Sequence, residues 1–424
     1  MSIFSCTNVC VELTDMRSDL EGALSQWKHL CDKSDTSYYI SHGWIATWCT
    51  SLEQTQQLYL MRVLKDDECV YACVVTTSKK MRQGIVPTRL VSVYSCGDIY
   101  LDSICGIYNH FLKLKEVGIS IRDVVNSFPF GWDEFYFPGA STRDFPGNGF
   151  YEYDDKYIIY DYDKPAYTVD LTKVGKTFDS FLSTLSQNTR SQIKRSMRAY
   201  KEFGELQVHE ADSRASAREM LEEMYYLGRL RKDAQGIVSS LNPYVIKFND
   251  NLLESRFSFH EIQVLKITAG DKIIGYLYNH VYNGTVYFYQ CGFHYSEDNK
   301  MRPGLVAHTL AIVYNANKNH MVYDFGAGED RYKKSLSNGK SNLVWVRLLK
   351  PTLKMKMFKT LKTFKEQSRV LLGGFFSRTL GKDRASPGRR KWSFGPARGA
   401  GAGRMPAGSE ADGGLAGLSP RPDL

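Results

Sequence analysis

The run YDFGAGEDRYKK, residues 323–334, gathers several side chains able to do acid–base chemistry within one short stretch. It contains two carboxyl groups (Asp324 and Glu329), a phenol (Tyr332) and an ammonium group (Lys333). A carboxylate can accept a proton from a nucleophile, a phenol can return one to a leaving group, and an ammonium can hold an anion. These residues are therefore candidate catalytic groups, and a solvated turn supported by an Asp–Lys pair is the other interpretation.

A second candidate site is the sequence KMRPGL at residues 300–305, a Pro-Gly turn that opens a predicted helix over residues 304–317. Exposed N–H groups at a helix start bind anions such as a phosphate or pyrophosphate. The candidate anion ligands are Arg302, Pro303, Gly304 and Leu305. The alternative is that the proline simply suits the first turn of a helix. The spacing matches neither the GxxxxGK[ST] nor the GxGxxG phosphate loop.

Two further elements carry candidate substrate-binding residues. A basic amphipathic helix within residues 178–203 presents Arg190 and Lys194, which could bind an anionic substrate or RNA. Such a stripe is more often a solvated face. The aromatic strand predicted at residues 285–293 includes Tyr289, whose face lines either a pocket or a packed layer.

Composition excludes several classes of protein. From residue 350 onward there are 16 Lys+Arg against 5 Asp+Glu, whereas the preceding residues have 39 against 41. A near-neutral body argues against a dedicated nucleic-acid-binding domain there. The nine cysteines form no CxxC pair or zinc-finger cluster, and no metal site is expected. They indicate reduced thiols, with the cytoplasm as the default compartment.

These residues need strands and helices to position them, and the predicted elements occur twice in the same order. Strands at 57–64, 69–77 and 90–94 precede a predicted helix at 107–117 and a strand at 132–137. Strands at 260–268, 272–282 and 285–293 precede the helix at 304–317 and a strand at 321–325. Two local echoes, VLK at 63 and 264 and EFYFPGA against VYDFGA, support a duplicated α/β unit.

The residues from 272 to 335 resemble the acyltransferase domain of the GNAT superfamily. More narrowly, they resemble its CelD-like branch, associated with cellulose and exopolysaccharide biosynthesis. The motif D-F-x-x-G-x-x-x-Y-K of that branch is met by Asp324, Phe325, Gly328, Tyr332 and Lys333. The resemblance extends over roughly residues 37–349, including the basic helix before Gly204.

The resemblance implies an α/β fold with a mixed sheet, in which two central strands splay apart to admit the acyl-pantetheine arm. It implies tandem GNAT-like domains, an N-terminal one (1–150) and a catalytic one (151–349). A basic amphipathic helix (350–372) and a disordered tail (373–424) rich in Gly, Pro and Arg follow. Backbone near Gln290, Cys291 and Gly292 would contact the donor, and the pyrophosphate would lie at Gly304.

The donor implied is acetyl-CoA or a longer acyl-CoA, and the acceptor an amine or hydroxyl of a sugar or cell-envelope precursor. The loop [QR]-x-x-G-x-[GA] of the superfamily is not met, because Met301 and Val306 stand at its first and last positions. FemAB-like transfer from an aminoacyl-tRNA is therefore one alternative, and a non-catalytic accessory protein of polysaccharide assembly is another. The helix at 350–372 could rest on the anionic inner face of a membrane.

Overall fold

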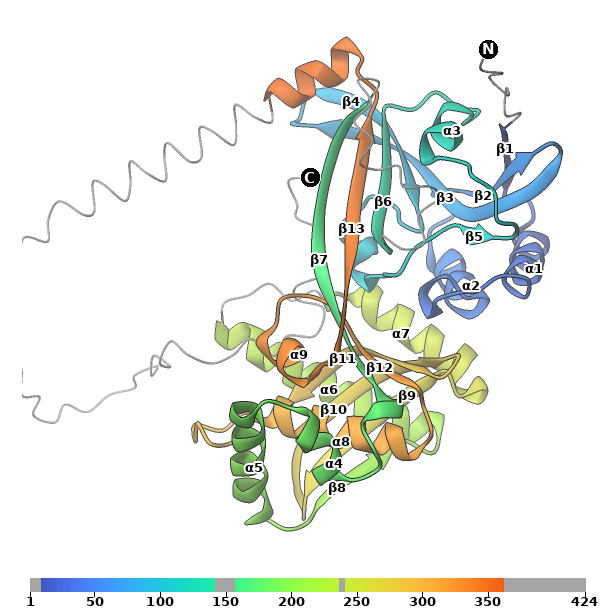
Figure 1. Cartoon of the computed structure of the whole chain (residues 1–424). Helices are drawn as coiled ribbons and strands as arrows, with labels where there is room; N and C mark the ends of the chain where they lie inside the picture. Colours follow the sequence, from blue (N-terminus) through green and yellow to red (C-terminus); the bar gives the residue numbers. More distant parts are fainter. Residues whose placement is uncertain (1–8, 142–156, 236–240, 362–424) are drawn as a thin grey trace, which may run out of the picture.

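The computed structural model describes residues 9–141, 157–235 and 241–361. The described strands form a single mixed sheet in the order β1-β2-β3-β4-β6-β13-β7-β12-β11-β10-β9-β8, and β5 pairs with β3 beside this path. Figure 1 shows two halves of this sheet, with the long strands β7 and β13 running from one half to the other.

The N-terminal half begins with a strand, followed by two helices and then by the predicted hairpin. Its strands are β1 (Val9–Asp15), β2 (Gln57–Lys65), β3 (Glu68–Arg82), β4 (Val86–Val93), β5 (Leu112–Lys113) and β6 (Glu134–Ser141). Its helices are α1 (Leu20–Cys31), η1 (Tyr38–Ile40), α2 (His42–Ser51), η2 (Leu101–Ile104) and α3 (Ile121–Asn126).

The C-terminal half follows the same plan. Its strands are β7 (Ile158–Asp170), β8 (Leu206–Glu210), β9 (Ile262–Ala269), β10 (Lys272–Tyr282), β11 (Thr285–Phe293), β12 (Val322–Ala327) and β13 (Gly339–Leu349). Its helices are η3 (Leu171–Lys173), α4 (Phe178–Thr184), α5 (Gln187–Lys201), α6 (Arg214–Gln235), α7 (Pro243–Arg256), η4 (Phe257–Phe259), α8 (Pro303–Asn317) and α9 (Arg331–Leu336).

The two halves have equivalent strand pairings, which confirms the predicted duplication of the fold. In each, a hairpin (β2–β3 or β9–β10) continues into a third antiparallel strand (β4 or β11), which then pairs in parallel with a fourth (β6 or β12). The third residue pair of these parallel ladders is Ser92–Tyr136 in one half and Tyr287–Asp324 in the other. The echo of EFYFPGA with VYDFGA aligns the same two β6 and β12 residues, so it reflects structural equivalence.

The VLK echo is less exact. It falls on the corresponding strands β2 and β9, but Lys65 ends β2 whereas Lys266 lies three residues before the end of β9. The helix predicted at 107–117 is wrong. This segment is extended: Asn109 pairs with Ala140 beside β6, and residues 112–113 form β5. The backbone at Tyr108 also has a φ of +58°, which a helix does not allow.

Several predictions fall on residues outside those that the structure describes. These are the domain boundary at 150–151, the tail from 373, and the part of the basic amphipathic helix beyond residue 361. Within the described part of that segment, residues 353–361 are helical.

The helices of the C-terminal half cover both faces of its sheet. On one face α8 packs on β9, β10 and β11 and is covered by α4 and α5, whereas α6 packs on β10 and β11 from the other face. The hydrophobic core on the α6 side is continuous with that of the N-terminal half, because α7 packs against α2 and Phe248 contacts Trp44. The side of the sheet opposite α8 therefore faces the junction of the two halves.

The central strands are joined across the halves by a buried ion-pair network. β13 pairs along its whole length with β7 and also pairs with β6. On β6, the fully buried Glu134 binds Arg82 of β3 through two hydrogen bonds of 2.7 and 2.9 Å. It also accepts hydrogen bonds from Arg347 of β13 at 3.0 Å and from Thr88 at 2.5 Å. Burial opposes ionisation, but these partners outweigh it and hold the pKa of Glu134 below its usual value.

We expect Glu134→Gln to lower the free energy of unfolding by about 3 kcal/mol or more, because it leaves a buried Arg347 without its charge partner. Urea denaturation measures this change. The matched control is Glu12→Gln, which removes an exposed pair with Arg62 and should cost about 0.5 kcal/mol.

The same network predicts a pH dependence with a definite sign. Since the folded pKa of Glu134 is lowered, the unfolded chain binds the proton at a higher pH. The stabilisation is complete above the unfolded pKa and is lost as the pH falls through the folded pKa. Equal losses of unfolding free energy in Glu134→Gln and Glu12→Gln would contradict this role for the network.

Candidate active site

The strands β11 and β12 form a fork at the centre of the C-terminal half. Their parallel ladder runs from Thr285–Val322 to Tyr287–Asp324, where pairing between these strands ends within the described residues. Beyond that point β12 continues along β7, where Ala327 pairs with Ala166, while β11 stays with β10. Asp324 therefore lies where the two strands begin to diverge, as the splayed strands of the predicted fold require.

The Asp324 carboxyl is buried and is held by two hydrogen-bond donors. Its Oδ1 accepts a bond of 2.6 Å from the Gly326 N–H and one of 2.9 Å from the Tyr108 hydroxyl. Burial raises the pKa of Asp324 to about 6, although both donors and the charge of Lys333 act in the opposite direction. A carboxyl with this pKa is ionised near neutral pH and still basic enough to accept a proton.

Lys333, on α9, braces the turn that follows β12. Its Nζ donates to the Ala327 carbonyl at 2.9 Å and forms an ion pair with Asp330 at 3.4 Å. Burial lowers the pKa of Lys333, against the opposing effects of Asp330 and Asp324. A buried ammonium with these partners fixes the turn and adds positive charge close to Asp324.

Asp324 and Tyr332, which the sequence predicted to work together, pack on opposite faces of β12. The Tyr332 ring stacks on His308 of α8 with centroids 5.0 Å apart and contacts the edge of Phe325 at 5.8 Å. Phe325 follows Asp324, so its side chain points to the other face of the strand. Glu329 is exposed in the turn after β12. Among the four predicted catalytic residues, Asp324 and Lys333 are linked through their charges, because the Lys333 ammonium lowers the pKa of Asp324 against the effect of burial.

The start of α8 lies beneath α5. The backbone N–H of Arg302 donates to the Ser196 hydroxyl at 2.8 Å, and its guanidinium donates to the Gln192 amide oxygen at 2.8 Å. Pro303, Gly304 and Leu305 are buried. The backbone N–H groups of the first turn after Pro303 and the positive charge of Arg302 are the features of this element suited to a donor phosphate.

On β11 the predicted donor-binding residues differ in their surroundings. Gln290 accepts a long hydrogen bond of 3.5 Å from Asn249 of α7, and Cys291 is half-buried. A methyl group on Gly292 would lie 2.3 Å from the Met224 carbonyl oxygen of α6, so no other residue fits here. Tyr289 is buried, and its hydroxyl donates to the Ile104 carbonyl at 2.9 Å. The Tyr289 hydroxyl thus links the halves.

The predicted substrate-binding residues of α5 lie on its outer side. Arg190 is half-buried and donates to the Ser183 carbonyl at 3.3 Å. Lys194 is exposed and lies 4.0 Å from Asp179. Both can meet an anion that approaches from solvent, but their contacts do not join them to Asp324.

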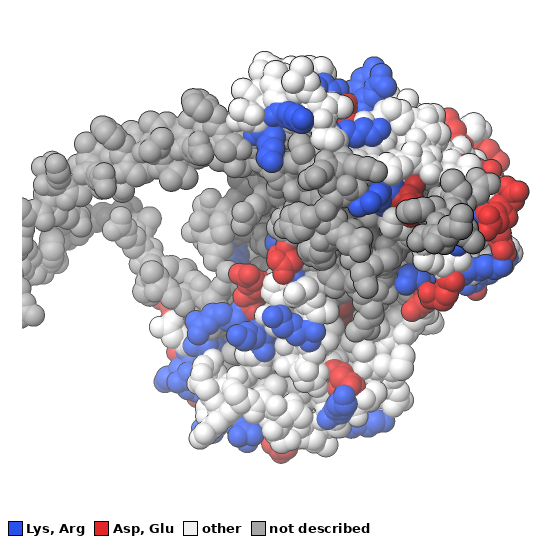
Figure 2. All heavy atoms as spheres, turned by 45° about the horizontal axis from the view of Figure 1, so that its top comes forward, with Lys and Arg blue, Asp and Glu red and all other residues white. Residues whose placement is uncertain are grey.

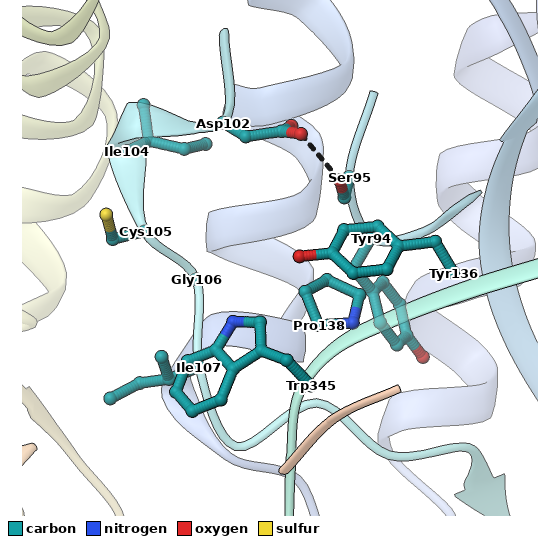
Figure 3. A pocket seen from close by; sticks show the side chains of 10 residues that line it. All are labelled: Tyr94, Ser95, Asp102, Ile104, Cys105, Gly106, Ile107, Tyr136, Pro138 and Trp345. Atoms are coloured by element: carbon teal, nitrogen blue, oxygen red, sulfur yellow. Dashed lines mark hydrogen bonds between the residues drawn. The ribbon is translucent and has the colours of Figure 1, made fainter. Parts of the chain in front are cut away.

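The equivalent fork of the N-terminal half, between β4 and β6, holds a small cavity of about 30 Å³ (Figure 3). Tyr94 and Ser95 line it from the end of β4, and Tyr136 and Pro138 line it from β6. A volume of this size holds about one or two water molecules and no acyl-pantetheine arm. Tyr136 also stands at the position in β6 that is equivalent to Asp324 in β12, so the N-terminal half has a phenol there and no carboxyl. Asp102, which also lines this cavity, is a carboxyl whose pKa burial raises to about 6, so the C-terminal fork is distinguished by the place of its acid at the last pair of the β11–β12 ladder.

Tyr108 is the contact of Asp324 that the sequence did not reveal. It comes from the N-terminal half, 216 residues away, in a segment predicted to be a helix. The sequence around a tyrosine in a loop contains no pattern that shows which distant side chain its hydroxyl contacts.

Residues 187–334 match the family model described as an acetyltransferase (GNAT) domain. The matched segment contains the fork, α8 and the catalytic candidates, and it ends at Lys334. The C-terminal half is thus GNAT-like by sequence, and the N-terminal half repeats its strand order, which confirms the predicted tandem GNAT-like fold.

Several solved structures are similar in shape at very low identity. A crystal structure of FemX is 10% identical, covers 80% of this chain and 98% of its own, and has a TM-score of 0.48. The C-terminal domain (DUF2156) of a putative lysylphosphatidylglycerol synthetase from Agrobacterium fabrum is 8% identical, with coverages of 80% and 94% and a TM-score of 0.43. A tandem GNAT protein from the clavulanic acid biosynthesis pathway is 9% identical, with coverages of 81% and 99% and a TM-score of 0.42.

No curated protein sequence matches this chain. Among the residues that the structure describes, no helix is long and apolar enough to cross a bilayer. Across the same residues, no three His, Cys, Asp or Glu side chains are grouped so that they could hold a metal ion.

We expect the Asp324 carboxyl to titrate with a midpoint near pH 6. Carbon-13 NMR of the side-chain carboxyls measures this, and the signal that disappears in Asp324→Asn identifies the Asp324 resonance. Lys333→Met should move this midpoint higher, because it removes a nearby positive charge. Asp170, whose pKa Lys173 and Thr172 lower, should titrate below its usual range in the same spectra and stay unchanged. A midpoint of Asp324 in the ordinary range of an aspartate would contradict the buried setting.

Proposed function

We propose that this protein transfers an acyl group from acyl-CoA to an amine or hydroxyl of an acceptor. The observation that carries this proposal is the buried Asp324 carboxyl, with a pKa of about 6, at the divergence of β11 and β12. It lies inside the segment that matches the GNAT domain. Direct acyl transfer needs a base of this kind beside the strands between which a thioester would lie.

The chemistry assigns one step to each group. The acceptor nitrogen or oxygen attacks the thioester carbonyl carbon, and Asp324 takes the proton that the nucleophile loses, directly or through a water. The tetrahedral intermediate then collapses and the carbon–sulfur bond breaks. The proton held by Asp324 passes to the leaving thiolate, directly or through water, which restores the base. The edge of β11 beyond Tyr287 has no ladder partner in β12, so backbone N–H groups near Gln290–Gly292 are candidates to stabilise the oxyanion.

Lys333 serves a supporting role in this scheme. It fixes the turn through the Ala327 carbonyl and keeps a positive charge near the base, which favours the ionised carboxylate. The donor pyrophosphate would lie at the start of α8, where Arg302 supplies charge and the N–H groups after Pro303 supply hydrogen bonds. An acceptor that is a sugar or cell-envelope precursor rests on the resemblance of residues 272–335 to the exopolysaccharide branch.

We expect calorimetric titration to show binding of acetyl-CoA or a longer acyl-CoA. Arg302→Gln should weaken this binding about tenfold, since a hydrogen bond to a charged group contributes about 1.5 kcal/mol or more. Arg62→Gln, an exposed change on β2, is the matched control and should bind as the unchanged protein does.

Asp324→Asn should separate binding from turnover. It should leave donor binding unchanged but reduce acceptor-dependent release of the CoA thiol at least about a hundredfold, because it removes the base. Amino sugars and polyols serve as acceptors in this assay, and the exposed Asp271→Asn of the β9–β10 turn is the control. Full turnover in Asp324→Asn would overturn the assignment of the base.

Absence of binding to either acyl-CoA would instead favour an aminoacyl-tRNA donor or a non-catalytic role. The exposed basic residues of α5, Lys194, Arg195 and Arg198, would then be the place to test tRNA contact. Such binding would weaken steeply with salt, since phosphate contacts release counterions.

A further inference from the structure

Residues 104–108, here called the strap, connect the N-terminal half to the fork of the C-terminal half. At one end the Ile104 carbonyl accepts the Tyr289 hydroxyl of β11 at 2.9 Å. At the other end the Tyr108 hydroxyl donates to Asp324 of β12 at 2.9 Å. The strap therefore contacts both strands of the fork.

The strap has a backbone that its sequence does not favour. Cys105 and Tyr108 have φ values of +51° and +58°, in the left-handed region that residues with a Cβ seldom adopt. Hydrogen bonds hold this conformation: the Ser37 hydroxyl donates to the Tyr108 carbonyl at 3.1 Å, and the Asn109 N–H donates to the Gly139 carbonyl at 3.1 Å. Uncommon conformations that the surroundings enforce in this way are often part of functional sites.

The groups that face Asp324 are few and come from several elements. They are Tyr39 of η1, Tyr108 of the strap, Tyr287 of β11 and Lys333 of α9. Burial and the adjacent carboxylate raise the pKa of Tyr108 well above its usual value, so its hydroxyl stays protonated and donates. Tyr108 is thus the N-terminal half's hydrogen-bond donor to the proposed base.

We propose that Tyr108 is a positioning residue of the acyl transfer, and that the active site is therefore composite, with the N-terminal half orienting the base of the C-terminal half. This inference rests on the proposed function. The Tyr108 hydroxyl stabilises the ionised Asp324 carboxylate and fixes which oxygen remains for the acceptor: Oδ1 already accepts two bonds, which leaves Oδ2 for the incoming proton.

Tyr108→Phe tests this role, because it keeps the ring and removes only the hydroxyl. The loss of a hydrogen bond to the carboxylate should move the rising limb of kcat/KM against pH upward by about one unit, equivalent to about 1.4 kcal/mol. Activity should fall about tenfold at pH values below the limb and recover largely above it. The Asp324 signal in carbon-13 NMR should move in the same direction.

The matched control is Tyr282→Phe, which removes a hydrogen bond of 2.8 Å to Thr36 at the same junction without touching Asp324. It should leave the pH profile unchanged. The inference would be overturned if the rising limb of kcat/KM against pH did not move in Tyr108→Phe, or moved equally in Tyr282→Phe. In either case the proposed function would still stand if Asp324→Asn abolished transfer. If Asp324→Asn retains transfer, the proposed function itself fails.

A second inference concerns the helix over residues 353–361, whose two faces have different partners. On its inner face Met355 and Phe358 pack on Val86 and Leu349, and Lys354 binds Asp133 at 2.7 Å. The outer face carries Leu353, Lys356, Met357 and Lys359, all exposed. The structure thus divides the apolar stripe expected from the sequence, and half of it faces outward.

The outer face combines unusually exposed apolar side chains with positive charge. Leu353 is 86% exposed and Met357 is 48% exposed. The neighbouring end of the β3–β4 hairpin adds Ile85 at 64% and Met81 at 60%. Of the lysines in residues 350–361, Lys356 and Lys359 lie on this outer face, whereas Lys354 binds Asp133 on the inner one. Figure 2, in which this end of the molecule comes forward, shows blue Lys and Arg side chains beside uncharged surface at the top of the view.

We infer that this outer face docks onto an anionic membrane surface. Apolar side chains beside lysines suit the interface of a bilayer, where the chains enter the headgroup region and the ammonium groups meet lipid phosphates. A protein partner of neutral surface would not use the lysines. This inference is independent of the proposed acyl transfer.

Co-sedimentation of the full chain with vesicles tests the docking. We expect binding to mixed phosphatidylcholine–phosphatidylglycerol vesicles, little binding to phosphatidylcholine alone, and about a tenfold loss in Leu353→Ser/Met357→Ser, which removes two insertable side chains. The control Tyr226→Ser/Leu230→Ser changes two similarly exposed side chains of α6. Unchanged binding of the first variant, or an equal loss in the control, would overturn the inference.

Discussion

The pairing of β7 with β13 is the constraint on which the rest of the structure depends. β13 is the last strand of the C-terminal half in the chain and lies between β7 and β6, so it joins the sheet of its own half to that of the N-terminal half. Main-chain hydrogen bonds along the whole of β13 hold the halves in one register, and the Glu134 network locks β6 to β13 from the side. The relative position of the two halves is therefore fixed by the hydrogen bonds of one shared sheet.

This fixed position allows a loop of one half to complete a site in the other. A hydrogen bond such as that between Tyr108 and Asp324 requires its atoms to be set within a few tenths of an ångström. A flexible linker between two domains would not maintain this geometry. The shared sheet, the junction core around Trp44 and Phe248, and the strap bring the two halves together at the fork.

Two buried carboxyl groups show how the environment separates a structural role from a chemical one. Glu134 meets two arginines and a threonine, so it remains ionised and stabilises the fold. Asp324 meets only a phenol and a backbone N–H, with Lys333 nearby, so burial prevails and raises its pKa to about 6. Glu134 stays ionised near neutral pH and does not exchange a proton there. Asp324, with a pKa of about 6, can gain and lose a proton in this range.

The sequence by itself determined most of the secondary structure and the repeat, because hydrophobic periodicity and turn residues act locally. It also located Asp324 and Lys333, which lie in one short motif. Only the tertiary structure decided that Tyr332 packs on the other face of β12, that residues 107–117 are extended, and that Tyr108 reaches Asp324. These outcomes depend on contacts between residues far apart in the chain, and such contacts leave no periodic trace in the sequence.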